Sequence, residues 1–286
     1  MPKVTYVNGR YLPHGQAVVH VEDRGFQFAD GVYEVIAVAN GTIVDEEAHL
    51  DRFDRSLSEL RLDWPVYRRA LGFIMREIIR RNTVRHGSIY LQATRGSAPR
   101  NHPFPDFSLP SLIVTARSAK KLSYEAALEK NSVISQPDIR WRRCDIKSVS
   151  LLPNVLLKQA AVEADAAESW LIDDRGIVTE GTASNAWIVT DQDELITRHL
   201  DSSILAGITR QAILKLISQE GISFLEREFT LEEAKQAKEA FFTSTTALVK
   251  PAVKIDEVII GDGQPGPLTR KILTYYMDYM DNIGGQ

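Results

Sequence analysis

The apolar positions of the first 118 residues follow a strand period and then a helix period, which predicts hairpins followed by helices. Asn8-Gly9 lies between β-prone residues at positions 5–12, and Asn40-Gly41 separates residues 32–39 from residues 42–44. Because Asn-Gly accommodates the tight turn of a two-residue loop, both segments predict β-hairpins.

Two amphipathic helices are predicted next, separated by the break at Trp64-Pro65. Their apolar stripes are Leu50, Phe53, Leu57 and Leu60 in the first and Tyr67, Leu71, Ile74 and Ile78 in the second. The second helix is rich in basic residues: Arg68, Arg69, Arg76, Arg80, Arg81, Arg85 and His86. We interpret these as the solvated face of the helix, with a partner-binding surface as the alternative.

Strands at residues 89–94 and 112–115 flank a loop that is stiffened by four prolines. A polar stretch follows, and beyond it strands and helices alternate. Strands are predicted near 132–135, 170–172, 186–190, 223–228 and 240–243, and helices at 153–167, 209–220 and 268–282. We therefore expect a two-domain chain, with a small N-terminal domain at 1–118, a linker at 119–124 and a large C-terminal domain at 125–286.

Composition restricts the class of protein. The 286 residues are enough for a substantial core without a metal, and the single cysteine, Cys144, allows no intrachain disulfide. The net charge of −4 argues against a nucleic-acid-binding protein. Because no stretch approaches the length of a membrane span and residues 1–15 contain no apolar signal core, we expect a cytoplasmic protein that binds no membrane.

Lys147 is a candidate nucleophile. It follows Arg140, Arg142 and Arg143, and cations close to a lysine favour the neutral amine that reacts with an aldehyde. Charge context alone is more typical of an exposed loop lysine, and Thr179-Glu180-Gly181 is by itself typical of a turn. Other motifs must decide between the two interpretations.

Four segments together resemble the pyridoxal-phosphate enzymes of fold type IV: residues 23–35 (DRGFQFADGVYEV), the block around Lys147, Thr179-Glu180-Gly181, and residues 207–210 (GITR). The loop at residues 94–105 also carries Arg100-x-His102, which is similar to the carboxylate-binding pair of D-amino-acid aminotransferases. The resemblance covers nearly the whole chain. It implies a small N-terminal α/β domain and a larger C-terminal domain with a mixed, barrel-like sheet and helices, an α+β to α/β fold.

The resemblance also implies roles for individual residues toward pyridoxal 5'-phosphate. Lys147 would hold the cofactor as a Schiff base and act as acid and base, and Glu180 would keep the pyridine nitrogen protonated. Donors for the phosphate would come from Ile208, Thr209, Ser244 and Thr245, with Arg52 as counter-charge, and Leu205 would pack on the ring. The chain reads Thr182-Ala183-Ser184 where relatives often carry three serines, so one hydroxyl is absent.

For the substrate, the resemblance implies that Arg100 and His102 grip the α-carboxylate. Tyr33 would add its hydroxyl, and Tyr90 would orient the group. The partners would be D-amino acids of the D-alanine and D-glutamate class and 2-oxo acids such as 2-oxoglutarate and pyruvate. The active site is expected at the subunit interface of a homodimer, with no metal.

Four alternatives stay open. Two are transaminases of other substrates, a branched-chain L-aminotransferase and an (R)-amine transaminase, whose usual forms lack the Arg-x-His pair. The third is an aminodeoxychorismate lyase that uses the same lysine to eliminate pyruvate. The fourth is a cofactor-free binding module of the same fold, which would stay colourless with pyridoxal phosphate.

Overall fold

The computed structural model describes residues 3–283, which divide into two compact units. Unit 1 comprises the chain up to Lys121, Ile146–Ser150 and the chain from Met280 on, and unit 2 comprises Leu122–Asp145 and Leu151–Tyr279. The short segment Ile146–Ser150 joins unit 1 through its backbone, because Tyr33 N donates to Lys147 O and Val149 N donates to Gly31 O. The contiguous division expected from the sequence differs from the observed units at this segment and at the chain from Met280 on, both of which the sequence placed in the C-terminal domain.

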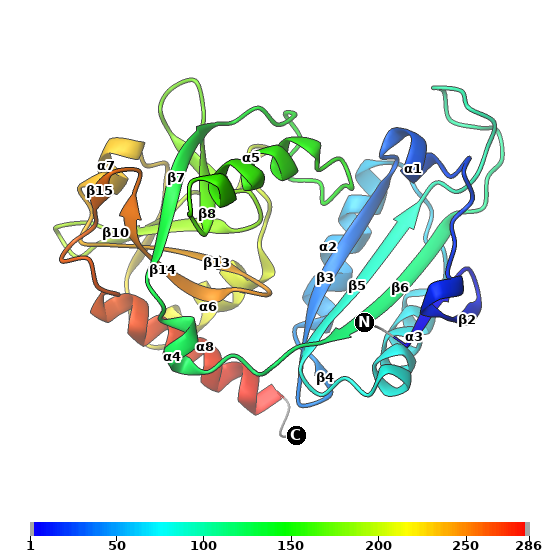
Figure 1. Ribbon diagram of the computed structural model, residues 1–286, viewed down its shortest axis with the longest axis horizontal. Coiled ribbons are helices and arrows are strands. Elements are labelled where there is room, and N and C mark those ends of the chain that lie inside the picture. Colours follow the sequence, from blue (N-terminus) through cyan, green and yellow to red (C-terminus); the bar gives the residue numbers. More distant parts are fainter. Residues whose placement is uncertain (1–2, 284–286) are drawn as a thin grey trace. The chain divides into compact units, whose positions relative to one another are not determined.

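Unit 1 is an antiparallel sheet with helices on one face (Figure 1). Within the described residues the sheet has six strands in the order β2-β1-β6-β5-β3-β4. Its elements are β1 (Val4–Val7), β2 (Arg10–Pro13), α1 (Arg24–Phe28), β3 (Gly31–Ala39), β4 (Thr42–Ile43), α2 (Glu46–Glu59), α3 (Arg68–Asn82), β5 (Gly87–Thr94) and β6 (Ser111–Ser118). Both predicted hairpins and both predicted helices are confirmed.

The core of unit 1 lies between the sheet and helices α2 and α3. Leu50, Phe53 and Leu57 of α2 and Leu71 and Ile78 of α3 are buried there, as their helical spacing predicts. The arginines of α3 face acidic partners instead: Arg68 pairs with Glu47 and Asp51, Arg76 with Glu46, and Arg80 and Arg81 with Glu77. Nearby carboxylates therefore balance the charge of these arginines, which favours a solvated helix face over the alternative of a partner-binding surface.

Unit 2 is a mixed sheet that curls until β9 approaches β10. Its nine strands within residues 3–283 run β12-β11-β10-β13-β14-β7-β8-β9, with β15 paired to β14. The elements are α4 (Tyr124–Ala127), β7 (Asn131–Pro137), α5 (Leu152–Glu163), β8 (Glu168–Ile172), β9 (Val178–Gly181), β10 (Asn185–Val189), β11 (Leu195–Thr197), α6 (Ile208–Gln219), β12 (Phe224–Glu226), α7 (Leu231–Lys235), β13 (Glu239–Ser244), β14 (Leu248–Ile255), β15 (Val258–Ile259) and α8 (Pro267–Ile283).

The sequence analysis missed β14 and β9 for different reasons. Strand β14 contains Pro251, which donates no hydrogen bond and argues against a strand, and a register shift follows at Ala252 and Lys254. The interpretation of Thr179-Glu180-Gly181 as a turn is wrong, because these residues form most of β9 beside β8. The strand is fully buried and short, so it shows no alternation of polar and apolar residues.

Candidate active site

Glu180 is a buried carboxylate at the centre of a polar cluster in unit 2. Its Oε1 lies 2.5 Å from Nη1 of Arg140, and its Oε2 accepts hydrogen bonds from Asn185 Nδ2 and Leu205 N, both at 3.1 Å. Burial raises the pKa of Glu180, although the charge and hydrogen bond of Arg140 oppose the rise. The site therefore contains a carboxylate with a fixed orientation and an appreciable affinity for a proton.

Arg140 holds Glu180 in place. Its guanidinium also forms a two-pronged ion pair with Asp138, at 2.9 and 2.7 Å, and donates to the carbonyl of Ser203. Burial opposes its charge, but Glu180 and Asp138 outweigh burial and raise the pKa of Arg140. The sequence analysis assigned this charge to the environment of Lys147 and missed the pairing, since Glu180 is forty residues away in the chain.

Asn185 joins the parts of this cluster. Its side-chain amide donates both to Glu180 and, at 3.0 Å, to the carbonyl of Leu205. A Cβ on Gly207 would meet Oδ1 of Asn185 at 2.0 Å, so Asn185 and the residue before α6 must approach closely. Because Asn185 is the first residue of β10 and pairs with Thr243 of β13, it places Glu180, Leu205 and the start of α6 beside one end of these two strands. The sequence alone offered no signal for this role.

The start of α6 is a candidate anion site. The helix begins at Ile208 after Gly207, and no side chain in the described part of the chain caps it. The first N–H groups of a helix lack partners within the helix, so this end has free donors and a positive dipole. Thr209 is buried beside Tyr276, and its hydroxyl lies 3.4 Å from the phenol. Ser244 accepts a hydrogen bond from Ala247 N at the end of β13.

Thr182 and Ser184 point away from this cluster. Both hydroxyls donate to the buried carboxylate of Glu168 on β8, with Ser184 at 2.9 Å. The backbone N–H groups of Thr182 and Ser169 donate to the same carboxylate. These residues thus stabilise the turn between β9 and β10.

Lys147 lies in unit 1, with its backbone fixed on both sides. Its N–H donates to the hydroxyl of Ser56 on α2 at 3.2 Å, and its carbonyl accepts from Tyr33 N at 3.0 Å. The Nζ atom lies 4.2 Å from the centre of the Tyr33 ring, and the side chain is half-buried. The amine is therefore oriented by an aromatic face.

Tyr33 and Tyr90 form a stacked pair on adjacent strands. Their ring centroids are 5.8 Å apart at an angle of 29°, as expected for neighbours on β3 and β5. Tyr90 donates from its hydroxyl to Gln92 Oε1 at 2.5 Å, and burial, together with Tyr33, raises the pKa of Tyr90 to about 12. Tyr90 is therefore a neutral phenol whose ring packs against Tyr33.

Arg52 belongs to a buried cluster with Glu34 and His49. Nε and Nη2 of Arg52 donate to the two oxygens of Glu34 at 2.8 and 2.7 Å, and His49 Nδ1 lies 2.8 Å from Oε2. Burial opposes ionisation of Glu34, but Arg52 and His49 outweigh it and hold its pKa at about 2. The pKa of His49 is lowered by burial, against the pull of Glu34, so His49 is a neutral donor near pH 7.

The variant Glu34→Gln, which lacks the buried charge, should lose less stability in acid than the wild type does. The folded pKa of Glu34 lies below its ordinary value of 4.5, so its stabilisation is present above that value and disappears as the pH falls toward 2. Between about pH 5 and pH 3 the wild type should lose about 2 kcal/mol more than Glu34→Gln. At neutral pH the variant itself should be less stable by about 3 kcal/mol, because Arg52 loses its buried counter-charge. The free energy of unfolding, measured by urea denaturation at several pH values, tests both points. If it falls equally steeply with acid in the wild type and in Glu34→Gln, the low pKa of Glu34 is contradicted.

Arg100 and His102 lie in the loop between β5 and β6, and both are exposed. They share one apolar contact. The guanidinium of Arg100 lies 5.0 Å from the centre of the Phe28 ring, and the imidazole of His102 lies 5.3 Å from it. The two side chains are therefore gathered at one aromatic residue of α1 with their polar groups open to solvent.

The structure places the candidate residues in two groups. Glu180, Leu205, Ile208 and Thr209 lie in unit 2, together with Ser244 and Thr245. Lys147, Tyr33, Tyr90, Arg52, Arg100 and His102 lie in unit 1. Sequence reasoning missed the orienting roles of Arg140, Asp138, Asn185, Glu34 and Ser56, because these roles depend on contacts that form only in the folded chain.

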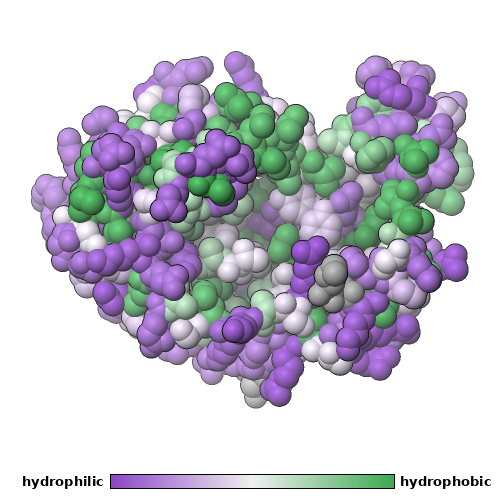
Figure 2. Space-filling model, in the orientation of Figure 1, coloured by the Kyte–Doolittle hydropathy of each residue, from purple (hydrophilic) through white to green (hydrophobic). Residues whose placement is uncertain are grey.

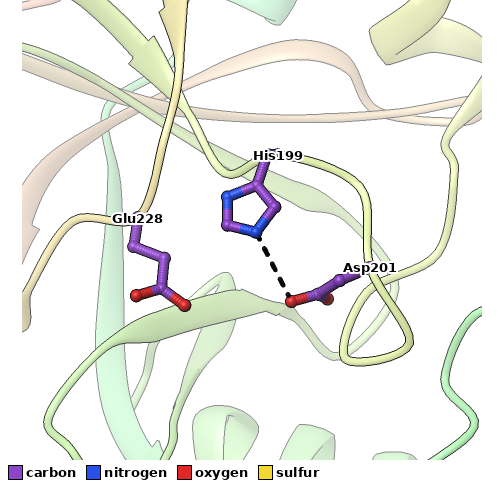
Figure 3. Close-up of side chains that lie close together, drawn as sticks. All are labelled: His199, Asp201 and Glu228. Atoms are coloured by element: carbon purple, nitrogen blue, oxygen red, sulfur yellow. Dashed lines mark ion pairs between the residues drawn. The ribbon is translucent and has the colours of Figure 1, made fainter.

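A second polar cluster in unit 2 comprises His199, Asp201 and Glu228, with His199 Nε2 3.8 Å from Asp201 (Figure 3). Arginines already compensate its carboxylates. Arg198 lies 2.7 Å from Asp201 and 3.0 Å from Glu228, and Arg175 lies 2.6 Å from Glu228. We therefore interpret the cluster as an ion-pair network rather than a metal centre.

Comparison with known proteins identifies the family. The model of the family Amino-transferase class IV matches residues 31–255. The chain is 40% identical over 283 residues to a D-alanine aminotransferase of Staphylococcus haemolyticus, with 99% of each chain covered, and 42% identical over 269 residues to that of Bacillus licheniformis, with 93% covered. The solved branched-chain aminotransferase of the thermophilic archaeon Thermoproteus uzoniensis, with norvaline, has a TM-score of 0.85 at 27% identity, covering 98% of this chain and 95% of that one. The chain belongs to the class IV aminotransferase family.

Members of this family use pyridoxal phosphate, and the fold is that of fold type IV, as the sequence predicted. The residues present fit this cofactor. An uncapped helix start suits a phosphate, and the buried Glu180, with its raised pKa, suits a protonated ring nitrogen. Lys147 supplies an amine with a fixed backbone. No helix among residues 3–283 is long and apolar enough to cross a membrane.

Proposed function

We propose that the protein transfers an amino group from a D-amino acid, such as D-alanine or D-glutamate, to a 2-oxo acid, such as 2-oxoglutarate or pyruvate. The observation that carries this proposal is the pair Arg100 and His102, gathered at Phe28 in a chain about 40% identical to D-alanine aminotransferases. A guanidinium and an imidazole side by side offer several donors to one carboxylate.

Lys147 would hold the cofactor through its amine as a Schiff base, and the same amine would serve as acid and base toward the proton of the substrate α-carbon. When bound, pyridoxal phosphate supplies the electron sink for that proton transfer. Glu180 would keep a proton on the ring nitrogen, held in orientation by Arg140, Asn185 and the N–H of Leu205. Tyr33, which lies against Lys147 Nζ, would orient the amine and contact the substrate.

The remaining predicted residues would anchor the cofactor. Ile208 and Thr209 would offer the free N–H groups of α6 to the phosphate, with hydroxyls from Ser244 and Thr245. Leu205, whose backbone is fixed by Glu180 and Asn185, would pack against the ring. Arg52 would supply the counter-charge while it remains paired with Glu34.

Arg100→Ala tests the proposal. The variant should raise the Michaelis constant for D-alanine and 2-oxoglutarate and lower kcat/KM about ten- to hundredfold, because each substrate presents a carboxylate to the same guanidinium. An (R)-amine without a carboxylate, such as (R)-1-phenylethylamine, should lose far less. Arg117→Ala, an exposed arginine on β6, is the matched control and should change neither. Equal losses on acid and amine would withdraw the assignment.

A branched-chain L-aminotransferase is the second candidate, because solved structures of branched-chain aminotransferases share the fold at TM-scores such as 0.85. Single-turnover bleaching of the cofactor absorbance with paired D- and L-amino acids separates the two. Rapid bleaching by D-alanine and D-glutamate, with slow bleaching by L-leucine, is the expected result. The opposite order would establish the L-specific alternative.

A homodimer in the cytoplasm completes the proposal. Helix α5 exposes Leu152, Val155, Leu156 and Val162, and Figure 2 shows apolar side chains over this part of unit 2. Apolar patches of this kind mark protein contacts more often than solvated faces. The free thiol of Cys144, whose pKa burial raises to about 12, is compatible with a reducing compartment. Sedimentation velocity tests the dimer, and a monomer at micromolar concentration would contradict it.

A further inference from the structure

Arg24 is a buried arginine of α1 that holds the loop between β5 and β6. Only 3% of it is exposed, and its Nε donates to Asp30 at 2.8 Å. Its other two nitrogens donate to the carbonyl oxygens of consecutive loop residues, Nη1 to Asn101 at 2.6 Å and Nη2 to His102 at 3.1 Å. One guanidinium thus connects a helix, an acidic side chain and two adjacent peptide groups of the loop.

The base of the loop is fixed to the same helix. Asp23, at the N-terminus of α1, accepts from Gly25 N and from the hydroxyl of Thr94, the last residue of β5. Gly25 has no room for a side chain, because a Cβ would meet Thr94 Cγ2 at 2.3 Å. Arg24 N donates to the carbonyl of Gly96. The helix and the first residues of the loop are therefore packed as one piece.

Asp30 carries the charge balance of this arrangement. It accepts from Arg24 and also from Arg95, whose Nε and Nη2 lie 2.8 and 3.0 Å from its oxygens. Burial opposes ionisation of Asp30, but the two arginines outweigh it and lower its pKa. Arg95 in turn lies 3.7 Å from the centre of the Phe104 ring, farther along the loop. The loop is held at two points by arginines that share one carboxylate.

The contacts of Arg24 coincide with those of Arg100 and His102. The Arg24 guanidinium lies 4.8 Å from the centre of the Phe28 ring, the ring that Arg100 and His102 also contact. The two loop carbonyls that Arg24 binds belong to His102 and to the residue between Arg100 and His102. Fixing both carbonyls fixes the peptide planes on either side of residue 102, and hence the directions in which the side chains of this segment leave the backbone.

We propose that Arg24 is a positioning residue for the substrate-carboxylate grip, which orients Arg100 and His102 from behind through the loop backbone. The inference rests on the proposed function, in which Arg100 and His102 bind the α-carboxylate. The loop residues 95–110 lie between β5 and β6 and contain no strand or helix, so side-chain contacts such as those of Arg24 add to the few backbone hydrogen bonds that order the loop.

Arg24→Lys separates positioning from folding. The lysine keeps the positive charge beside Asp30, but one ammonium group cannot reproduce the planar fork that reaches two carbonyls at once. The Michaelis constants for D-alanine and 2-oxoglutarate should rise about tenfold with kcat within about twofold, and (R)-1-phenylethylamine should react as before. Arg76→Lys, at an exposed arginine with a two-pronged pair to Glu46, is the control and should change nothing.

A double variant distinguishes failure of this inference from failure of the proposed function. If Arg24 acts through Arg100, Arg24→Lys should add little to the loss already caused by Arg100→Ala on D-alanine. The positioning role is overturned if the loss in the double variant equals the product of the two single losses on D-alanine. It is also overturned if Arg24→Lys impairs the amine as much as D-alanine. If instead Arg100→Ala impairs carboxylate substrates no more than it impairs the amine, the proposed function fails, whatever the effect of Arg24→Lys.

A second variant covers the case in which Arg24→Lys does not fold. Phe28 is half-buried, so Phe28→Leu should preserve the fold while removing the ring that Arg24, Arg100 and His102 contact. It should raise the Michaelis constants for the same carboxylate substrates, by a smaller factor, and leave the amine unaffected. Unchanged constants in a folded Phe28→Leu variant would overturn the inference.

Discussion

Lys147→Ala should abolish transamination and covalent attachment of the cofactor while leaving the fold intact. The lysine is half-buried, and its hydrogen bonds to Ser56 and Tyr33 are made by the backbone, which alanine retains. Removal of the amine eliminates both the covalent link and the group that moves the substrate proton, so the loss should reach several orders of magnitude. Turnover of D-alanine with 2-oxoglutarate and circular dichroism provide the two measurements.

Lys250 is the matched control for this substitution. Burial lowers its pKa, which would favour a nucleophilic amine, but its Nζ donates to the carbonyl of Ala126 on α4. Lys250→Ala should therefore retain the covalent link. Borohydride reduction of the wild type followed by peptide mapping should label Lys147, and a label on Lys250 would transfer the catalytic assignment to unit 2.

Glu180→Gln should lower turnover at least a hundredfold while the cofactor stays bound, an effect of about 3 kcal/mol on the barrier. A neutral amide cannot balance a proton on the ring nitrogen. The amide would also disturb its own surroundings, because Glu180 accepts from three donors, Arg140, Asn185 and the N–H of Leu205. Glutamine keeps one accepting oxygen, but its amide nitrogen cannot accept a hydrogen bond, so at least one of these donors loses its partner.

Glu239→Gln is the control for burial of a carboxylate in unit 2. Glu239 is also buried and accepts three hydrogen bonds, from Leu268 N and from the N–H and hydroxyl of Thr269 at the start of α8. This variant should be less stable but should turn over normally per folded molecule. Near-normal turnover in Glu180→Gln would reduce Glu180 to a structural residue of β9.

Local patterns determined much of unit 1. The two Asn-Gly turns and the apolar stripes of α2 and α3 depend on contacts within a few residues, so their periods are visible in the chain. The start of α6 was visible for the same reason, because a helix that begins after glycine with buried Ile208 and Thr209 needs only local geometry. The buried strands β9 and β14 show no such period, and Pro251 conceals the second.

Residue types in short motifs identified the candidates Lys147, Glu180, Arg100 and His102, but only the tertiary structure decided what orients each of them. Arg140 meets Glu180 across forty residues, and Arg24 reaches the loop carbonyls of residues 101 and 102 across nearly eighty. Such pairs are set by which strands become neighbours, and that depends on burial of the whole core rather than on any segment. The identity of a reactive side chain is thus a property of the sequence, while its orientation and proton affinity are properties of the fold.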